Sequence, residues 1–118
     1  MLKKTIKYKD YNGEEQERDF YFNLSQAELI EMELSATGGL EAMVKRLMEE
    51  VNGKEIVKLF KEIILKSYGE RTVDGRFEKS EEISKRFSET AAYSDLFVEL
   101  VTDADAAAAF VNGIAGAE

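Results

Sequence analysis

Side chains that carry out chemistry are scarce in this chain. Its 118 residues include no histidine and no cysteine, whereas 24 are Asp or Glu. The usual general base near neutral pH, the thiol nucleophile and the commonest zinc ligands are therefore all missing. Nothing in the spacing of the carboxylates places two of them in one apolar cleft where their pKa values would separate. We predict that the protein is not an enzyme and has no catalytic, cofactor-binding or metal-binding residue.

Two acidic stretches invite comparison with calcium loops, which place glycine sixth and a bidentate glutamate twelfth. Asp10-Tyr-Asn-Gly13 resembles the start of such a loop, but its sixth and twelfth positions are Glu15 and Tyr21. Asp103 and Asp105 also lack a glutamate at the required spacing. A turn and the start of a helix are the better interpretations of these two stretches.

The net charge of −8 is unevenly distributed along the chain. All 16 Lys and Arg residues lie at or before Arg86, and the stretch beyond it carries six of the 24 acidic residues. An acidic surface repels phosphate backbones and anionic lipid, so we expect neither nucleic acid nor membranes as partners. No apolar run approaches the roughly 18 residues of a membrane span, and no secretory leader is apparent, which predicts a cytoplasmic protein.

The length and composition of the chain predict one folded domain over 1–118, because apolar residues make up 44% and no linker or repeat interrupts them. We expect an α+β fold, in which an N-terminal β-hairpin over 1–24 packs on a helical body over 25–112. That body should contain five or six helices. A flexible tail over 113–118 is expected to follow.

The hairpin prediction rests on a turn signal between two alternating segments. Residues 3–9 and 14–22 flank Asp10-Tyr-Asn-Gly13, and Asn-Gly is the strongest short signal for a type I′ hairpin turn. The even positions carry the apolar side chains that would face the helices: Ile6, Tyr8, Phe20 and Phe22. A lone hairpin is marginal in water, so it must lie on helices or pair with another strand.

Helix signals fill the rest of the chain. Ser25 and Glu28 have the capping-box spacing at the start of a helix over about 26–35. Further helices are expected over about 40–51, over 54–68, from Ser80 to a break near 88–90, around 93–101 and over 104–111. Gly69 is predicted to end the 54–68 helix in a left-handed conformation. The segment 71–79 contains Asp74-Gly75 and is either a loop or a small second hairpin.

Candidate contact residues for another protein chain come from the hairpin and from the helical stripes. Tyr11 and Tyr21 lie on the outer side of the predicted hairpin, where exposed tyrosines suit interfaces, although the hairpin could equally serve only to shield its own core. We expect a further contact surface in an apolar groove between helices of the 40–101 region. Its candidate residues are Met43, Leu47, Phe60 and Phe97.

Five short stretches, distributed between residues 20 and 114, carry a family resemblance that extends over nearly all of the chain. They are Phe20-Tyr-Phe-Asn-Leu-Ser-Gln-Ala-Glu-Leu-Ile-Glu-Met-Glu-Leu34, Gly38-Gly-Leu40, Lys66-Ser-Tyr-Gly69, Phe87-Ser-Glu-Thr-Ala-Ala-Tyr-Ser-Asp-Leu96 and Ala109-Phe-Val-Asn-Gly-Ile114. Together these stretches resemble the tail assembly chaperones of long-tailed bacteriophages and prophages of Gram-positive bacteria. They are structural signatures and assign no site residue.

The resemblance implies a non-catalytic protein that binds the tape measure protein in the cytoplasm of the bacterial host and is absent from the mature virion. It also implies self-association, for which the 14–22 strand edge is our candidate, and a longer form made by frameshifting. An alternative of another class is an acidic phage-encoded inhibitor that mimics DNA. Its support is the cation-free stretch after Arg86, but the acids there are interrupted by apolar positions.

Overall fold

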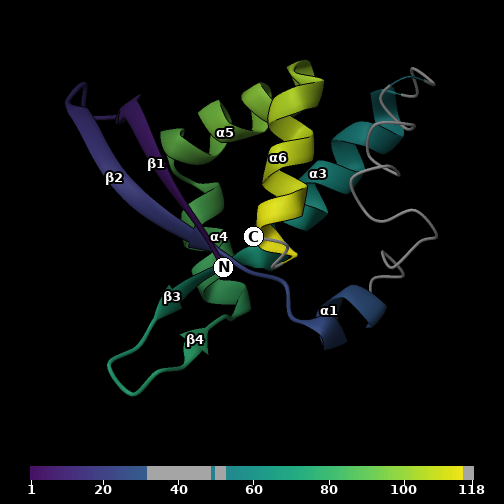
Figure 1. Ribbon diagram of the computed structural model, residues 1–118. Coiled ribbons are helices and arrows are strands. Elements are labelled where there is room, and N and C mark those ends of the chain that lie inside the picture. Colours follow the sequence, from purple (N-terminus) through teal and green to yellow (C-terminus); the bar gives the residue numbers. More distant parts are fainter. Residues whose placement is uncertain (32–48, 50–52, 116–118) are drawn as a thin grey trace.

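The computed structural model describes residues 1–31, 49 and 53–115. Over these residues the chain has an α+β fold in which antiparallel strands pack against five helices, as the sequence predicts (Figure 1). The elements are β1 (Leu2–Lys9), β2 (Glu15–Phe22), α1 (Gln26–Glu31), α3 (Gly53–Ser67), β3 (Tyr68–Arg71), β4 (Phe77–Glu78), α4 (Glu81–Ser88), α5 (Ala91–Thr102) and α6 (Ala104–Ile114). The helix predicted over 40–51 lies outside the described residues.

The four strands form one antiparallel sheet in the order β1-β2-β3-β4. β1 and β2 pair along their whole length, from Leu2 opposite Phe22 to Lys9 opposite Glu15. β3 extends the sheet by pairing with only the last two residues of β2, and β4 then pairs with β3. The 71–79 segment therefore belongs to a second hairpin, one of the two possibilities that the sequence left open.

The turn of the first hairpin is not the predicted type I′ turn. The Gly13 N–H donates to the Asp10 C=O at 3.0 Å, so Tyr11 and Asn12 are the central residues. Gly13 follows them with a φ of +84°, which is typical of a three-residue loop that ends in a bulge. The Asp10 carboxylate accepts the N–H groups of Asn12 and Glu14, each at 2.9 Å, and so favours this longer loop.

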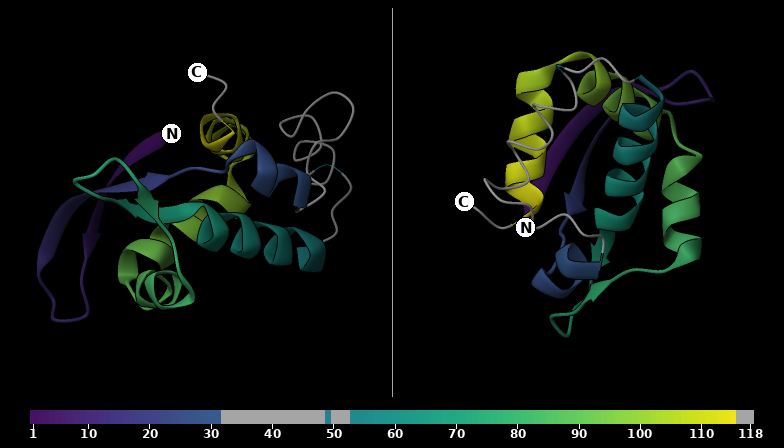
Figure 2. Two further views of the ribbon diagram at one scale, coloured as in Figure 1. Left: turned by 90° about the horizontal axis from the view of Figure 1, so that it is seen from below. Right: turned by 90° about the vertical axis from the view of Figure 1, so that its right-hand side faces the viewer.

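The core lies between one face of the sheet and the helices. In Figures 1 and 2 the β1–β2 hairpin and α3 lie on opposite sides of α5 and α6. The predicted inward side chains Ile6, Phe20 and Phe22 are buried, and Tyr8 packs against the same cluster. α3, α4, α5 and α6 complete this core with Ile56, Phe60, Ile63, Ile64, Phe87, Ala92, Leu96, Leu100, Ala107, Phe110, Val111 and Ile114. The alternating strands and the striped helices thus share one core.

The end of α3 corrects the sequence prediction. The helix stops at Ser67, and Gly69 lies buried inside β3 without the predicted positive φ. A Cβ on Gly69 would lie 2.7 Å from the ring of Phe77 and 2.8 Å from the Glu78 carbonyl oxygen. Glycine is required at this position because β4 approaches too closely for a side chain, and not because the helix needs a left-handed cap.

Most of the predicted helix starts are present. Ser25 and Glu28 form the expected capping box, in which the Glu28 N–H donates to Ser25 Oγ at 3.2 Å and the Ser25 N–H donates to Glu28 Oε1 at 3.0 Å. Ser80 caps α4, and Asp103 caps α6. The break predicted near 88–90 is the junction at which α4 ends and Thr90 caps α5.

The C-terminal helix is longer than the sequence suggests. α6 continues through Gly113 to Ile114, whose side chain is fully buried. A Cβ on Gly113 would lie 2.9 Å from Leu2 Cδ1, so the glycine allows β1 to pack against the end of the helix. The first two residues of the tail predicted over 113–118 therefore belong to the packed body, and residues 116–118 lie outside the described part.

Candidate interaction surfaces

The two tyrosines predicted as partner contacts have different environments. Tyr11 lies at the tip of the β1–β2 hairpin with 78% of its surface exposed. Tyr21 is half-buried, and the Arg71 guanidinium lies over its ring at 4.2 Å from the centroid. Arg71 Nη2 also donates to the Tyr21 hydroxyl at 3.1 Å. Tyr11 is thus available to a partner, whereas Tyr21 already ties β2 to β3.

Phe60 and Phe97, the two helical candidates among the described residues, do not line an apolar groove. Phe60 is 0% exposed and belongs to the core, so it cannot contact a partner in the folded state. Phe97 is half-buried, with its ring centroid 6.0 Å from that of Tyr93. Met43 and Leu47 lie outside the described residues. The buried apolar residues of α3, Ile56, Phe60, Ile63 and Ile64, face the protein interior.

A surface groove of about 670 Å³ does lie between helices of the predicted region. α3 contributes Lys61, Glu62, Leu65 and Lys66, α4 contributes Glu81, Ser84, Lys85 and Ser88, and Glu28, Lys79 and Ser80 complete the lining. We call this site the α3–α4 groove. Its lining is mostly charged or hydroxyl-bearing, because the apolar residues of both helices face the core.

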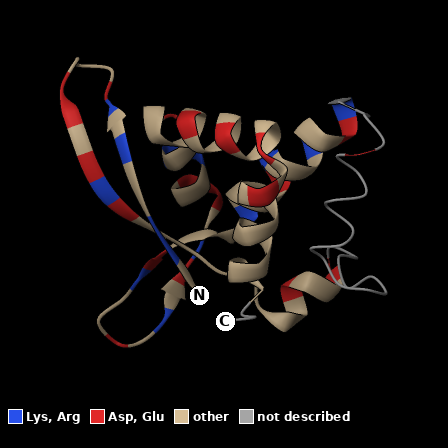
Figure 3. Cartoon of the chain, turned by 45° about the horizontal axis from the view of Figure 1, so that its top comes forward, with Lys and Arg blue, Asp and Glu red and all other residues tan. Residues whose placement is uncertain are grey.

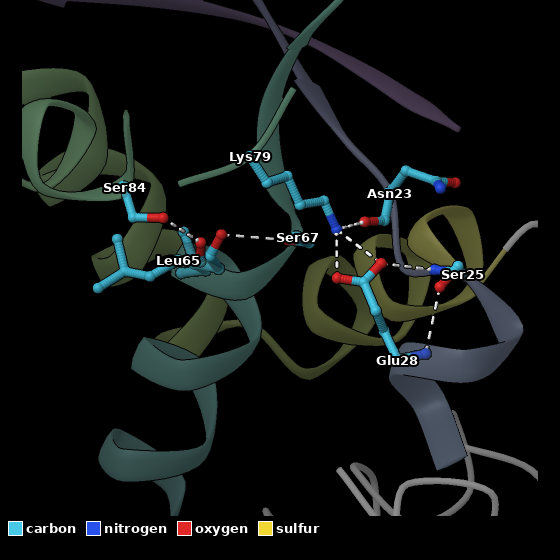
Figure 4. Close-up of polar contacts among 8 residues, drawn as sticks. Asn23, Ser25, Glu28, Leu65, Ser67, Lys79 and Ser84 are labelled. Carbon is cyan, nitrogen blue, oxygen red and sulfur yellow. Dashed lines mark hydrogen bonds and ion pairs between the residues drawn. The ribbon is translucent and has the colours of Figure 1, made fainter. Parts of the chain in front are cut away.

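The side of the groove formed by α4 carries several small side chains, because a serine recurs on it every four residues. Ser80 accepts the Ile83 N–H, Ser84 donates to the Leu65 C=O at 2.9 Å, and Ser88 donates to the Lys85 C=O at 2.7 Å. The Ser84 bond joins α4 to α3 across the floor of the groove (Figure 4). These small side chains leave room for another chain to approach. The prediction from sequence missed this side of the groove, although the spacing of the serines could have indicated it.

A polar cluster closes one end of the groove, and we call it the Lys79–Glu28 latch (Figure 4). Lys79 Nζ donates to both Glu28 carboxylate oxygens, at 2.8 and 2.7 Å, and to the Asn23 carbonyl at 2.6 Å. Burial raises the pKa of Glu28, but the hydrogen bonds from Lys79 and Ser25 outweigh it and hold the pKa below its usual value. The latch thereby fixes the start of α1 against the segment between β4 and α4.

Several cations elsewhere in the structure form ion pairs. They are Lys4–Glu99 at 2.9 Å, Lys7–Glu17 at 3.8 Å, Arg76–Asp74 at 3.0 Å and Arg86–Glu70 at 3.7 Å. By contrast, Lys61, Lys66 and Lys85 have no ion pair with any residue that the structure describes. Figure 3 shows how the two signs of charge are distributed, with acids along β2 and α5.

The described residues also lack two other kinds of functional feature. In residues 1–31, 49 and 53–115, no group of acidic side chains is arranged so that it could hold a metal ion. None of the helices built from these residues combines the length and the apolarity that crossing a membrane requires.

A comparison with protein families decides between the functional alternatives. The family model described as "phage tail assembly chaperone" matches residues 1–118, the whole chain. The chain belongs to the phage tail assembly chaperone family. No curated protein and no solved structure matches it. The chaperone is non-catalytic and acts with tail proteins, which agrees with the lack of His and Cys and displaces the DNA-mimic alternative.

Proposed function

We propose that the chaperone binds the tape measure protein and keeps it soluble in the host cytoplasm until the tail is assembled, and that it is absent from the mature virion. The observation that carries this proposal is the family match over residues 1–118. The family resemblance further implies that the client forms long apolar helices. We also propose a Gram-positive host, on the basis of the motifs that suggested the family.

The α3–α4 groove is the proposed contact surface for the tape measure protein. A groove between two helices suits an amphipathic helix, which is a common mode of peptide recognition. Leu65 is half-buried and offers an apolar contact on its floor. Phe60 no longer belongs to the proposed contact set because it is buried, while Tyr11 remains a secondary candidate at the hairpin tip.

Coexpression with the cognate tape measure protein tests this function. We expect the client to remain in the soluble fraction and to copurify with the chaperone. Leu65→Ala should reduce the amount that copurifies, whereas Val73→Ala is a matched control, since Val73 is fully exposed in the β3–β4 turn and does not line the groove. An insoluble client with no complex would overturn the proposal.

Self-association is the second part of the proposal. β3 pairs with β2 only at Tyr21 and Phe22, so within the described residues no strand covers the outer edge of β2 over 15–20. An open strand edge is a template for pairing with another chain. We propose that several copies bind one tape measure and pair through this edge. Light scattering of Glu17→Pro, which removes an N–H donor that points away from β1, should show smaller assemblies than the unaltered chain.

A frameshifted longer form is the remaining proposed partner. Its support is the family resemblance alone. Mass spectrometry of infected cells should detect peptides that begin within this chain and continue into a different reading frame. Finding only the chain described here would remove this partner from the proposal.

A further inference from the structure

The α3–α4 groove is cationic within an acidic protein. Its lining contains four lysines and three glutamates, whereas the whole chain has a net charge of −8. One of those glutamates, Glu28, is already paired with Lys79 in the latch. Among the described residues that line the groove, Glu62 and Glu81 are the remaining acids beside Lys61, Lys66 and Lys85, and neither glutamate forms an ion pair with these lysines.

The cationic character continues along α3 beyond the groove. At 100° per residue, Lys54, Lys58 and Lys61 fall on one narrow stripe, and Leu65 continues the same line. This stripe lies on the side of α3 opposite the buried Ile63. All three lysines are exposed, and none of them has an ion pair with the described residues. A chain lying in the groove would thus contact lysines of both α3 and α4, and would pass further lysines of α3 where it leaves the groove.

We propose that the α3–α4 groove selects amphipathic helical segments of the client that carry carboxylates on either side of a narrow apolar stripe. This inference rests on the proposed function, because it names the chemistry of the tape measure segment that binds there. In this arrangement the client's apolar stripe contacts Leu65, and its carboxylates pair with Lys61, Lys66 and Lys85. The small serine side chains of α4 leave room for the client's backbone.

The charge distribution also explains why such a segment binds in one place. An acidic segment is repelled by the overall negative charge of the chaperone and attracted to the groove lysines, which have no ion pair with any described residue. A basic or uncharged apolar helix would not gain this electrostatic attraction to the groove. Lys79 does not contribute to this selection, since its charge is satisfied by Glu28 and the Asn23 carbonyl. The three unpaired lysines therefore set both the preference and the register.

Overlapping helical peptides that tile the cognate tape measure protein provide the test. Fluorescence anisotropy should find that the tightest peptides carry carboxylates at helical spacing beside apolar residues. Their affinity should fall as salt is added, since exposed ion pairs are screened. The combined variant Lys61→Glu, Lys66→Glu and Lys85→Glu should bind them at least roughly tenfold more weakly.

A matched variant controls for net charge. Lys3→Glu, Lys7→Glu and Lys9→Glu make the same change at exposed positions of β1 that do not line the groove, and should leave peptide binding unchanged. Circular dichroism confirms that both variants are folded. Replacing the carboxylates of the best peptide by lysines should restore its binding to the groove variant but not to the unaltered chaperone.

Two results would overturn the inference, and they differ in what they say about the function. Full-length tape measure protein copurifying equally well with the groove variant and the unaltered chaperone would refute the inference and leave the proposed function intact. A failure of the unaltered chaperone to bind either the peptides or the full-length client would refute both.

Discussion

The two hairpins of this chaperone end in the same turn but are held in the fold by different forces. In both, a glycine N–H donates back three residues, from Gly13 to Asp10 and from Gly75 to Thr72, and the glycine has a φ of +84° or +87°. The first hairpin has two strands of eight residues, whereas the second has strands of four and two. Turn chemistry alone therefore sets neither the length of a hairpin nor its contribution to stability.

The difference between the hairpins lies in what their strands bury. The first hairpin places Ile6, Phe20 and Phe22 in the core. The only residue that the second buries fully is Gly69, where β4 approaches closely. Its other anchors are the half-buried Tyr68, whose ring stacks on that of Phe87 at 4.2 Å between centroids, and the neighbouring Lys79–Glu28 latch. A long amphipathic strand pair is stabilised by the burial of several side chains, while this short one depends on one aromatic contact, a close backbone approach and local polar bonds.

Removing an aromatic ring from each hairpin should show the contrast most strongly. Phe22→Ala should lower the free energy of unfolding by about 3–5 kcal/mol, because Phe22 is fully buried and its loss leaves a cavity. Phe77→Ala should cost clearly less, since Phe77 is only half-buried. Urea unfolding followed by circular dichroism measures both changes. Equal losses would mean that the second hairpin is as well packed as the first.

Gly69→Ala tests the backbone contact that fixes the second hairpin. The added methyl group would overlap the Phe77 ring and the Glu78 carbonyl, so we expect a loss of about 1–3 kcal/mol in the same urea experiment. Gly113→Ala is the matched control, because its methyl group meets only the flexible Leu2 side chain in a helix that favours alanine. A neutral Gly69→Ala would contradict the close-packing argument.

Glu28→Gln tests the latch beside the second hairpin. Because the pKa of Glu28 is lower in the folded chain, its ion pair stabilises the fold above the carboxyl pKa of the unfolded chain. This stability is lost as the pH falls through the lower folded-state pKa. The variant should lose about 1–2 kcal/mol near neutral pH and lack this part of the acid dependence. Unfolding measured across the acidic range with no difference between the two proteins would rule out a stabilising latch.

Alanine at the two turn glycines should have the smallest effect. Gly13→Ala should cost about 1 kcal/mol of global stability, because alanine is strained at positive φ. Gly75→Ala should cost less globally and instead speed the hydrogen exchange of the Thr72 N–H, which closes the β3–β4 turn on the Arg76 carbonyl. Identical global losses with no change in exchange would show that both hairpins unfold only with the whole domain.

Local patterns in the sequence were sufficient to predict several parts of this structure. The alternation around Asn12-Gly13 predicted the first hairpin and its inward face, and the Ser25–Glu28 spacing predicted a capping box that is present. These features depend on residues close in sequence or on a simple period, so no distant contact is needed to recognise them. The same reasoning misplaced Gly69, because the reason for that glycine is the approach of Phe77 from another strand.

The candidate site likewise combines features that follow from the sequence with features that depend on distant contacts. The sequence determined an acidic chain with amphipathic helices and without histidine or cysteine, because charge, composition and periodicity are properties of the residues themselves. Only the tertiary structure decided that Phe60 is core, that Lys61 and Lys85 border one groove, and that Lys79 pairs with Glu28 across 51 positions of sequence. Packing α3 against α4 buries their apolar faces and brings their polar faces together, and that outcome depends on contacts between distant residues.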